Sequence, residues 1–326
     1  MKILFCCPDY FGFHKVIEEA IQNNLKAEVK TIVFRKYKYK NNFQKIKNFI
    51  YKTVFKINLK KVLASKERIS SIAKNEIFDF LFIVSPDLLI KEDLEYIIKK
   101  SKHSVVYYWD SFDNIARYKE TVGLFDIAYS FEPKDVENYK LNFLTNFYHV
   151  SNTHPETTTD VYFIGSYDER LKIVLKILTY LKNKKKSTKI YIHCNKKKII
   201  KQNKNSDIIY FNKPISIIES EKLFQNSKVI LDVQKKIQKG LTFRVFEAMG
   251  NRKKLITTNT DIINYDFYNP NNIFIWREDT KEIPESFFNT NYQELPKEIF
   301  EKYNIDNWVK QIFDLNKTQL GIESTE

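Results

Sequence analysis

Short apolar runs alternate with stretches of helical periodicity along nearly the whole chain. In the first half, the runs that we expect to be strands are Ile3–Cys7, Glu28–Phe34, Phe78–Val84, Ser104–Trp109, Ile127–Ser130 and Phe143–Tyr148. In the second half they are Val161–Gly165, Lys189–Cys194, Ile208–Phe211, Val229–Val233, Leu255–Thr258 and Ile273–Trp276. Nearly continuous apolar strands that are separated by helices are typical of parallel sheets covered on both faces. The pattern therefore predicts an α/β protein with two Rossmann-like halves.

A polar stretch without periodicity separates the two halves. Residues 151–159, which read Ser-Asn-Thr-His-Pro-Glu-Thr-Thr-Thr, are the best candidate for a linker. With 326 residues the chain is long enough for two domains of about 150 residues each. We expect a first domain over 1–150, a second over 151–300, and a C-terminal segment, 301–326, whose helix could cross back onto the first. Since parallel sheets bind ligands at the carboxyl ends of their strands, we also expect a ligand cleft between the halves.

The composition is that of a folded, cytoplasmic protein. The chain is 43% hydrophobic and has only 6 Gly and 8 Pro, which argues against a disordered sequence. Its apolar opening, Ile3–Cys7, is too short for a signal peptide, and no run approaches the roughly 18–20 apolar residues of a spanning helix. Cys6, Cys7 and Cys194 lack the spacing of a disulfide framework or a metal site, so we expect reduced thiols.

The formal net charge of +14 needs an explanation. Nucleic acid, an anionic membrane surface and a phosphate-bearing substrate would all suit it. The alternative is codon bias, because Lys, Asn and Ile are plentiful whereas Arg occurs only seven times. In such a chain the position of an Arg is more informative than that of a Lys.

One segment departs from the average composition of the chain. From Arg35 to Lys61 there are ten Lys or Arg residues and no acidic residue. Apolar residues recur there at i+3 and i+4 spacing: Phe43, Ile46, Ile50, Val54 and Ile57. We interpret 35–61 as a basic amphipathic helix that lies on the inner, cytoplasmic surface of a membrane. The alternative is an ordinary domain helix whose apolar stripe packs on the sheet while its lysines are solvated.

The strongest local signal is a glycine loop that opens a helix after a parallel strand. Gly240-Leu241-Thr242 follows the strand Val229–Val233 and precedes the helical pattern Phe243–Gly250. Such a helix start presents backbone N–H groups and the positive end of the helix dipole to an anion. Thr242 is placed to cap the helix and to donate to a phosphate. Glu247 is placed to accept two vicinal hydroxyls, as in a ribose, and Arg244 lies three residues earlier on about the same face. The alternative is a capped helix with an Arg–Glu surface pair.

This segment resembles the nucleotide-sugar-binding signature of the "glycosyl transferases group 1" families of the GT-B fold. In that signature a helix with Arg-Val-Phe-Glu-Ala, here residues 244–248, precedes a strand that ends in Thr or Asn, here 254–259. Residues 107–111, 125–132 and 160–167 are similar to blocks of lipopolysaccharide and capsule glycosyltransferases of that group. The resemblance covers nearly the whole chain. It implies an enzyme that moves a sugar from a nucleotide sugar to a glycan or lipid-linked acceptor in bacterial surface polysaccharide synthesis, and the segment 35–61 predicts that this enzyme is a peripheral membrane protein.

The resemblance also implies roles for single residues on the donor side. Glu247 matches the carboxylate that binds the donor ribose, while Gly165 and Ser166 match the loop near the diphosphate. Arg170 would neutralise the diphosphate, because its fork suits phosphate. Lys213 falls where these families contact the nucleobase, although it could be a solvated loop lysine. Lys239 departs from the pattern, since many retaining members carry a second glutamate at that position, and retaining chemistry of that subtype is therefore in doubt.

An inverting transfer needs a base for the proton of the acceptor hydroxyl. Asp110 and Asp113, which follow the fourth strand, and His14, which follows the first, are the candidates, with Asp9 beside them. The alternatives are a helix cap for Asp110, paired with Ser111, and a loop or cap histidine for His14. We expect no metal ion, because no Asp-x-Asp dyad follows a strand and no His or Cys cluster has ligand spacing.

Three other functions remain to be weighed against a transferase. A nucleotide-sugar hydrolase or epimerase on the same fold would have an identical donor site, and only an acceptor surface separates them. A nucleic-acid binder is disfavoured, because no RNP, KH, helix-turn-helix or zinc signature is present. A dehydrogenase is disfavoured because Gly-x-Gly-x-x-Gly is absent after Cys7 and after Gly165.

Overall fold

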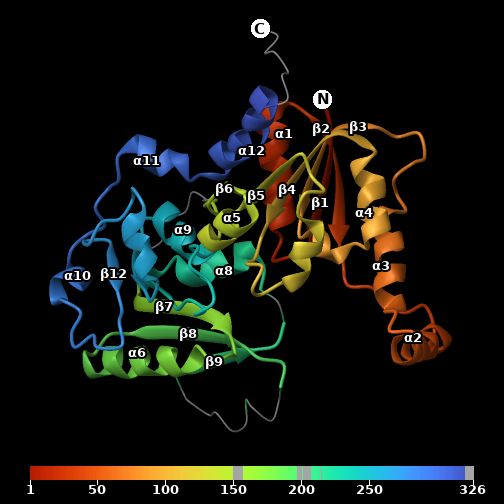
Figure 1. Cartoon of the computed structure of the whole chain (residues 1–326). Helices are drawn as coiled ribbons and strands as arrows, with labels where there is room; N and C mark the ends of the chain where they lie inside the picture. The colour runs from red at the N-terminus through yellow and green to blue at the C-terminus, as the bar shows by residue number, and fades with distance from the viewer. Residues whose placement is uncertain (150–156, 197–199, 201–206, 214, 320–326) are drawn as a thin grey trace. The chain divides into compact units, whose positions relative to one another are not determined.

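The computed structural model describes residues 1–149, 157–196, 200, 207–213 and 215–319 (Figure 1). Contacts between residues divide the chain into two compact units. The first consists of Met1–Leu144 together with Val309–Glu326, and the second is Thr145–Trp308. Most of the predicted linker, residues 151–156 of 151–159, lies outside the described residues, as does the preceding residue 150.

The first unit is built on a parallel sheet of six strands in the order β2-β1-β3-β4-β5-β6. The strands are β1 (Lys2–Pro8), β2 (Glu28–Phe34), β3 (Phe78–Val84), β4 (Ser101–Tyr108), β5 (Ile127–Ser130) and β6 (Asn142–Phe143). The helices are α1 (Phe13–Leu25), α2 (Asn42–Val54), α3 (Leu59–Ile69), α4 (Lys91–Ile98), α5 (Pro133–Tyr139), the part of α12 (Ile305–Gln319) that begins at Val309, and the 3-10 turns η1 (Pro86–Leu88) and η2 (Ala116–Thr121). The chain order reverses between β1 and β3, so the loops that leave these two strands diverge at their carboxyl ends.

Apolar side chains on both faces of the central strands form the core of this unit. Phe5 of β1 stacks on Phe82 of β3, with 5.3 Å between the ring centroids. Phe313 of α12 meets Phe80 and Phe82 edge-on, at 5.6 Å and 5.9 Å. All of these rings are buried. The last helix therefore contributes to the core of the sheet that begins with the first strand of the chain.

The second unit is built on another parallel sheet of six strands, in the order β12-β11-β10-β7-β8-β9. The strands are β7 (Thr159–Ser166), β8 (Thr188–His193), β9 (Ile208–Phe211), β10 (Ser227–Asp232), β11 (Lys254–Thr257) and β12 (Ile273–Ile275). The helices are α6 (Leu171–Asn183), α8 (Ile217–Phe224), α9 (Phe243–Gly250), α10 (Glu285–Asn289), α11 (Lys297–Lys302) and the 3-10 turn η3 (Thr260–Asn264). Counted from β7, this is the strand order of a Rossmann fold, with its switch point between β7 and β10.

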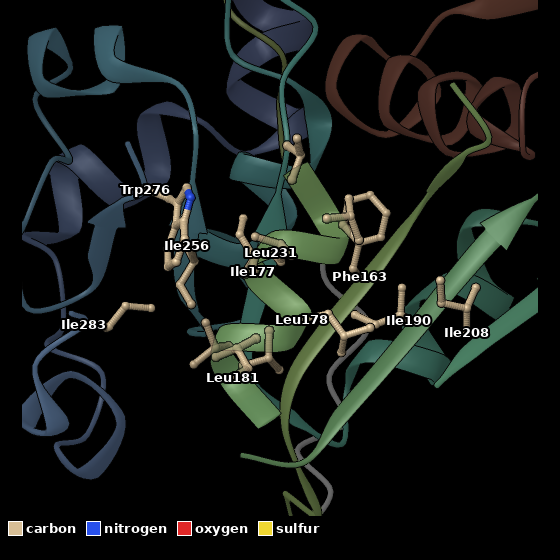
Figure 2. Packing of buried hydrophobic residues seen from close by; sticks show 14 of the residues in the cluster. Phe163, Ile177, Leu178, Leu181, Ile190, Ile208, Leu231, Ile256, Trp276 and Ile283 are labelled. Carbon is tan, nitrogen blue, oxygen red and sulfur yellow. The ribbon is translucent and has the colours of Figure 1, made fainter. Parts of the chain in front are cut away.

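Helix α6 covers one face of this second sheet. Its buried residues, Leu171, Val174, Ile177, Leu178 and Leu181, recur at helical spacing. Figure 2 shows Ile177, Leu178 and Leu181 of this helix among Ile190 of β8, Ile208 of β9 and Ile256 of β11. A stripe of this width is what an amphipathic helix buries against a core.

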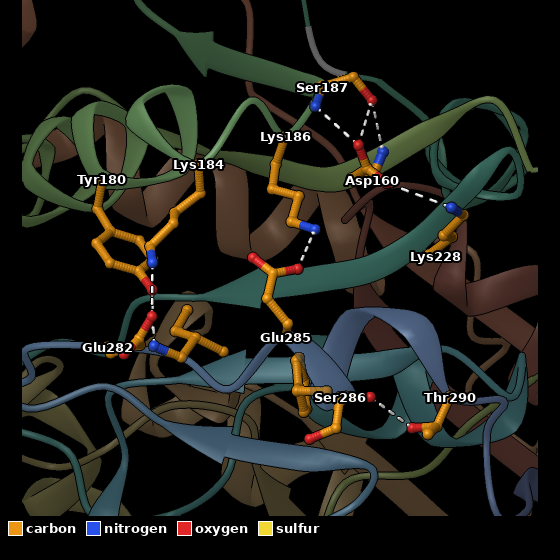
Figure 3. A network of polar contacts seen from close by, with 12 residues as sticks. Asp160, Tyr180, Lys184, Lys186, Ser187, Lys228, Glu282, Glu285, Ser286 and Thr290 are labelled. Carbon is orange, nitrogen blue, oxygen red and sulfur yellow. Dashed lines mark hydrogen bonds and ion pairs between the residues drawn. The ribbon is translucent and has the colours of Figure 1, made fainter.

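Polar contacts at the edge of the second unit hold its turns in place (Figure 3). Asp160 of β7 accepts hydrogen bonds from the backbone N–H of Ser187, at 2.8 Å, and from its hydroxyl, at 2.9 Å. Lys184 and Lys186, after α6, pair with Glu282 at 2.6 Å and with Glu285 at 2.8 Å. Both glutamates are exposed, so solvent screens these pairs, and they select the conformation of the turns more than they stabilise the unit.

The α/β class with two parallel sheets, predicted from the sequence, is confirmed, and each predicted strand has a counterpart. The largest difference concerns the prediction Phe143–Tyr148, because β6 ends at Phe143. The backbone N–H of Tyr148 donates to the carbonyl of Tyr303 at 2.9 Å, and the N–H of Ile305 donates to the carbonyl of Tyr148 at 3.0 Å. The N–H of Leu144 still donates to the carbonyl of Ser130 in β5, whereas Tyr148 forms an isolated parallel bridge with Asn304.

Candidate nucleotide-binding site

The switch point of the second sheet brings most of the predicted donor residues to one region. Gly165 and Ser166 form the carboxyl end of β7. The loop after β10 contains Lys239, Gly240 and Leu241 and leads into α9. Because β7 and β10 are neighbours and parallel, their carboxyl ends lie at the same edge of the sheet. This is the edge at which open α/β sheets bind their ligands.

Two amide side chains fix the loop between β10 and α9. Gln234 Nε2 donates to the carbonyls of Gln238, at 2.6 Å, and Gly240, at 3.1 Å. Asn259, which follows β11, donates through Nδ2 to the carbonyl of Lys239 at 2.9 Å. Both amides are buried. The loop that precedes α9 therefore has a defined conformation, in which Lys239 is exposed and Gly240 and Leu241 are buried.

Thr242 stands at the N-cap position of α9, but its side chain does not cap the helix. Its hydroxyl donates to Asp232 Oδ1 at 2.9 Å, while Thr257 Oγ1 donates to Asp232 Oδ2 at 2.9 Å. Burial raises the pKa of Asp232, although these two hydroxyls oppose the shift. The prediction that Thr242 caps the helix is thus wrong, because its hydroxyl bonds to Asp232, the last residue of β10, and not to the backbone of α9. The side chain of Thr242 therefore leaves the first turn of α9 uncapped, while the N–H of Val245 donates to the carbonyl of Thr242 at 3.1 Å. Binding of an anion at this helix start stays a prediction.

Glu247 and Arg244 form a pair on α9 that is mostly buried. Glu247 is 8% exposed, and its Oε2 lies 2.6 Å from Arg244 Nη1. That contact lacks hydrogen-bond geometry, and Oε2 has no hydrogen-bond partner among the described residues. Burial raises the pKa of Glu247 against the opposing charge of Arg244. The surface pair considered from the sequence is therefore a buried pair. A ribose could reach only the small part of this carboxyl that remains exposed, and the ribose contact stays a prediction.

Arg170 has a different environment from the one that the sequence suggested. It precedes α6, and its guanidinium binds Asp168 in a bidentate manner, with Nε–Oδ1 at 2.9 Å and Nη2–Oδ2 at 2.6 Å. Arg170 Nη1 donates to the carbonyl of Val233, just after β10, at 3.1 Å. Arg170 therefore braces the loop after β7 against the end of β10. Asp168 already compensates its charge, and the contact with a diphosphate stays a prediction.

The remaining donor candidates lie on loops. Lys213 is exposed, two residues after β9, as in the solvated-lysine alternative, and the neighbouring Pro214 lies outside the described residues. At Gly165 an added Cβ would lie 2.7 Å from the ring of Phe163. The ring would have to move to admit any larger residue there.

The candidate bases lie at the carboxyl edge of the first sheet. Asp110 Oδ1 accepts the backbone N–H of Ser111 at 2.8 Å and its Oδ2 accepts from Asn114, as a local cap would. Asp113 is exposed and forms an ion pair with Lys134 at 2.7 Å. The hydrogen bond from Lys134, followed by its charge, lowers the pKa of Asp113, which makes this carboxylate a weaker base.

His14 begins α1 beside a small apolar pocket. Its Nδ1 lies 3.6 Å from Asp9 Oδ1 and has no hydrogen bond among the described residues. The pocket is lined by Cys7, Pro8, Tyr10, Phe13, His14, Ile17, Val84 and Trp109. The turn before α1 needs positive φ at Phe11 and at Gly12, where glycine adopts it without a steric penalty.

Sequence reasoning missed Asp87, which lies in η1, three residues after the end of β3. Its Oδ1 is buried and has no hydrogen-bond partner among the described residues. Burial raises the pKa of Asp87 to about 6, although its own backbone N–H and Arg68 oppose the shift. Ser85, between β3 and Asp87, has a φ of 57°. Asp87 could have been predicted from Ser-Pro-Asp after an apolar run, because ligands of α/β sheets bind at the carboxyl ends of the strands.

The described part of the chain has neither a metal-binding cluster nor a membrane-spanning helix. No group of three or more His, Cys, Asp or Glu residues is arranged to hold a metal ion in that part of the chain. Among the helices that the structure describes, none combines the length and the apolar character needed to cross a bilayer.

Solved structures supply the comparison, because no family model and no curated protein matches the chain. HepE from Anabaena, solved in complex with UDP and glucose, matches with a TM-score of 0.57 at 11% identity, over 98% of this chain and 100% of that one. The catalytic domain of starch synthase IV from Arabidopsis thaliana, bound to ADP and acarbose, matches with 0.49 at 8% identity, over 98% of each chain. T4 phage BGT in complex with its UDP-glucose substrate matches with 0.47 at 14% identity, over 99% and 93%. The last two lie below a TM-score of 0.5 and add nothing to the assignment. With its two parallel six-stranded sheets and flanking helices, the chain has the GT-B fold.

Proposed function

We propose that this protein is a glycosyltransferase that binds a nucleotide sugar at the carboxyl edge of its second sheet. The observation that carries the proposal is the place of α9, which begins at the carboxyl edge of the second sheet, after the loop that leaves β10 at the switch point. Backbone N–H groups at such a helix start suit a diphosphate, and their dipoles are fixed before the ligand arrives. The likeness to HepE, whose structure holds UDP and glucose, supports the same ligand class.

The donor ribose is proposed to bind next to the diphosphate, on the side of Glu247. In the part of the chain that the structure describes, Oε2 of this residue has no hydrogen-bond partner, and a ribose hydroxyl could supply one. Arg244, whose side chain is 22% exposed, lies 2.6 Å from this oxygen and opposes the rise in the pKa of Glu247 that burial causes. Lys213, Lys239, Gly165 and Ser166 are proposed contacts from the surrounding loops. No metal ion is expected to be needed for donor activation, since the helix start and the basic side chains balance the charge of the leaving nucleotide.

The acceptor is proposed to be a glycan or a lipid-linked saccharide of bacterial surface polysaccharide synthesis. In the transfer, the acceptor oxygen bonds to the anomeric carbon of the sugar, and the bond from that carbon to the diphosphate breaks. The proton of the acceptor hydroxyl passes to a base on the first unit. His14, Asp110 and Asp87 are the proposed bases, whereas Lys134 weakens Asp113 for this role. A lipid-linked acceptor would place the enzyme at the inner face of the cytoplasmic membrane.

Thermal unfolding in the presence of UDP, GDP, CMP and dTDP tests the donor site. One nucleotide should raise the melting temperature by mass action, and EDTA should leave that rise unchanged. Glu247→Gln keeps the size of the side chain and should reduce the rise by at least half. The exposed Glu278→Gln is the matched control and should keep the full rise.

Two outcomes contradict the proposal. If no nucleotide raises the melting temperature, the second sheet has no donor site. If Glu247→Gln keeps the full rise, the ribose assignment is wrong while the diphosphate site stands. Transferase activity is then tested by incubating the protein with the matching nucleotide sugar and an extract of membrane glycolipids and measuring the nucleotide that is released.

A further inference from the structure

Helix α2 contacts the rest of the first unit through polar side chains. The three of its residues that are not fully exposed are Gln44, Asn48 and Tyr51, which share one side of the helix. Gln44 Oε1 accepts from the hydroxyl of Tyr37 at 3.2 Å, and Asn48 Oδ1 accepts from the backbone N–H of Lys60 at 2.8 Å. A helix that packs on its own protein normally does so through its apolar side. Here that relation is inverted.

The apolar side of α2 is exposed to solvent. None of the residues of this helix, all of which the structure describes, is buried. The exposed fraction is 72% for Phe43 and 70% for Phe49. The exposed apolar set runs beyond the helix and consists of Phe43, Ile46, Phe49, Ile50, Val54, Phe55 and Ile57. We call these seven side chains the α2 apolar surface. Single exposed apolar residues are ordinary, but a contiguous set of this kind marks an interaction site.

The charge around the α2 apolar surface narrows the choice of partner. The segment from residue 35 to 61 has ten cations and no acid, and three of these cations, Lys45, Lys47 and Lys52, lie on the helix itself. A second copy of this chain would bring an equal positive charge to the same place, so pairing of two α2 surfaces is opposed by repulsion. An anionic surface that also accepts aromatic and aliphatic side chains meets both requirements. The interface of a bilayer with anionic lipids is such a surface.

We propose that α2 docks this protein on an anionic lipid bilayer and lies in the plane of the interface, with the α2 apolar surface among the acyl chains. Its thirteen residues span about 20 Å, which is too short to cross the hydrocarbon core. Phe43, Phe49 and Phe55 enter the boundary region, and the lysines contact lipid phosphates. Gln44 and Asn48 keep the helix attached to the first unit. The inference requires no enzymatic activity, so it stands or fails separately from the proposed function.

Co-sedimentation of the full chain with vesicles tests the proposal. The protein should bind vesicles that contain phosphatidylglycerol at least tenfold more tightly than vesicles of phosphatidylcholine alone, and added salt should weaken the binding. The double variant Phe43→Ser/Phe49→Ser should lower the partition constant at least tenfold. The control Ile263→Ser changes an exposed apolar residue of the second unit and should leave it unchanged.

A triple variant examines the charge by itself. Lys45→Gln/Lys47→Gln/Lys52→Gln should lower binding three- to tenfold, whereas Lys281→Gln/Lys297→Gln/Lys310→Gln removes as many cations elsewhere and should have a much smaller effect. Since the changed side chains of α2 are exposed, thermal unfolding of these variants should match that of the parent. Binding that survives the double phenylalanine variant overturns the proposal, as does equal binding to neutral vesicles. A dimer in solution that this variant abolishes would assign the surface to a second copy and would also overturn it.

Discussion

Helices α6 and α2 have the same length, thirteen residues, and the same spacing of apolar positions, but opposite environments. In α6 the stripe that includes Ile177 and Leu178 is buried against the second sheet. In α2 the corresponding stripe is exposed to water, and the side that contacts the rest of the first unit is polar and only partly exposed. Both helices carry lysines, so periodicity and lysine content together do not decide which side of a helix meets the protein. The contacts decide it: α6 packs its apolar stripe on the strands of the second sheet, whereas α2 contacts Tyr37 and Lys60 through Gln44 and Asn48.

The largest difference between the two helices is expected in the free energy of unfolding when one side chain of each apolar stripe is shortened. Ile177→Ala should lower the free energy of unfolding by about 2–5 kcal/mol, because Ile177 is fully buried and a cavity would remain. Ile46→Ala on α2 should change it by less than about 0.5 kcal/mol, since Ile46 is exposed. Urea denaturation measures both. Similar losses in the two variants would mean that the α2 stripe is packed in solution.

An intermediate effect is expected on the polar sides of the two helices. Asn48→Ala removes the hydrogen bond that the N–H of Lys60 donates and should cost about 1 kcal/mol. Thr179→Ala, on the exposed side of α6, removes only a bond to the carbonyl of Leu175 within the helix and should cost almost nothing. Hydrogen exchange of the α2 amides should also become faster in Asn48→Ala. Unchanged exchange would show that other contacts hold the helix.

The smallest effect concerns pH. Burial opposes the charge of Asp168 before α6, but the hydrogen bonds and the charge of Arg170 outweigh it and lower the pKa of Asp168 in the folded chain. Its contribution to stability is therefore full above the unfolded value of about 3.9 and is lost as the pH falls through the folded pKa. Asp168→Asn should remove this part of the acid sensitivity. Residues 35–61 contain no acid, so vesicle binding by α2 should not change between pH 5 and 8 through titration of that segment. If Asp168→Asn altered the pH dependence of vesicle binding, the two pH effects would not be independent.

The sequence predicted those features that depend on local pattern. The bounds Glu28–Phe34, Phe78–Val84, Ile127–Ser130 and Ile208–Phe211 agree with the structure, since apolar runs with polar flanks limit a buried strand on both sides. The helix after Gly240 was also predictable, because a glycine loop and a helical stripe follow one another there.

Contacts between segments distant in the sequence could not be predicted in the same way. The hydroxyl of Thr242 bonds to Asp232, ten residues earlier, because β10 ends beside the start of α9. Arg170 donates to the carbonyl of Val233 because β7 and β10 are neighbours in the sheet. Glu247 is buried because six consecutive residues of α9 face the core. In each case the partner is set by strand order, which a pattern of apolar residues does not contain.

The packing of Phe313 on Phe80 and Phe82 has a consequence for how the protein is made. The first unit draws its core from both ends of the chain, whereas the second unit is continuous from Thr145 to Trp308. A ribosome therefore releases every residue of the second unit before it releases the side chains that complete the first. During synthesis part of the aromatic face of the first sheet therefore stays exposed until α12 has been synthesised.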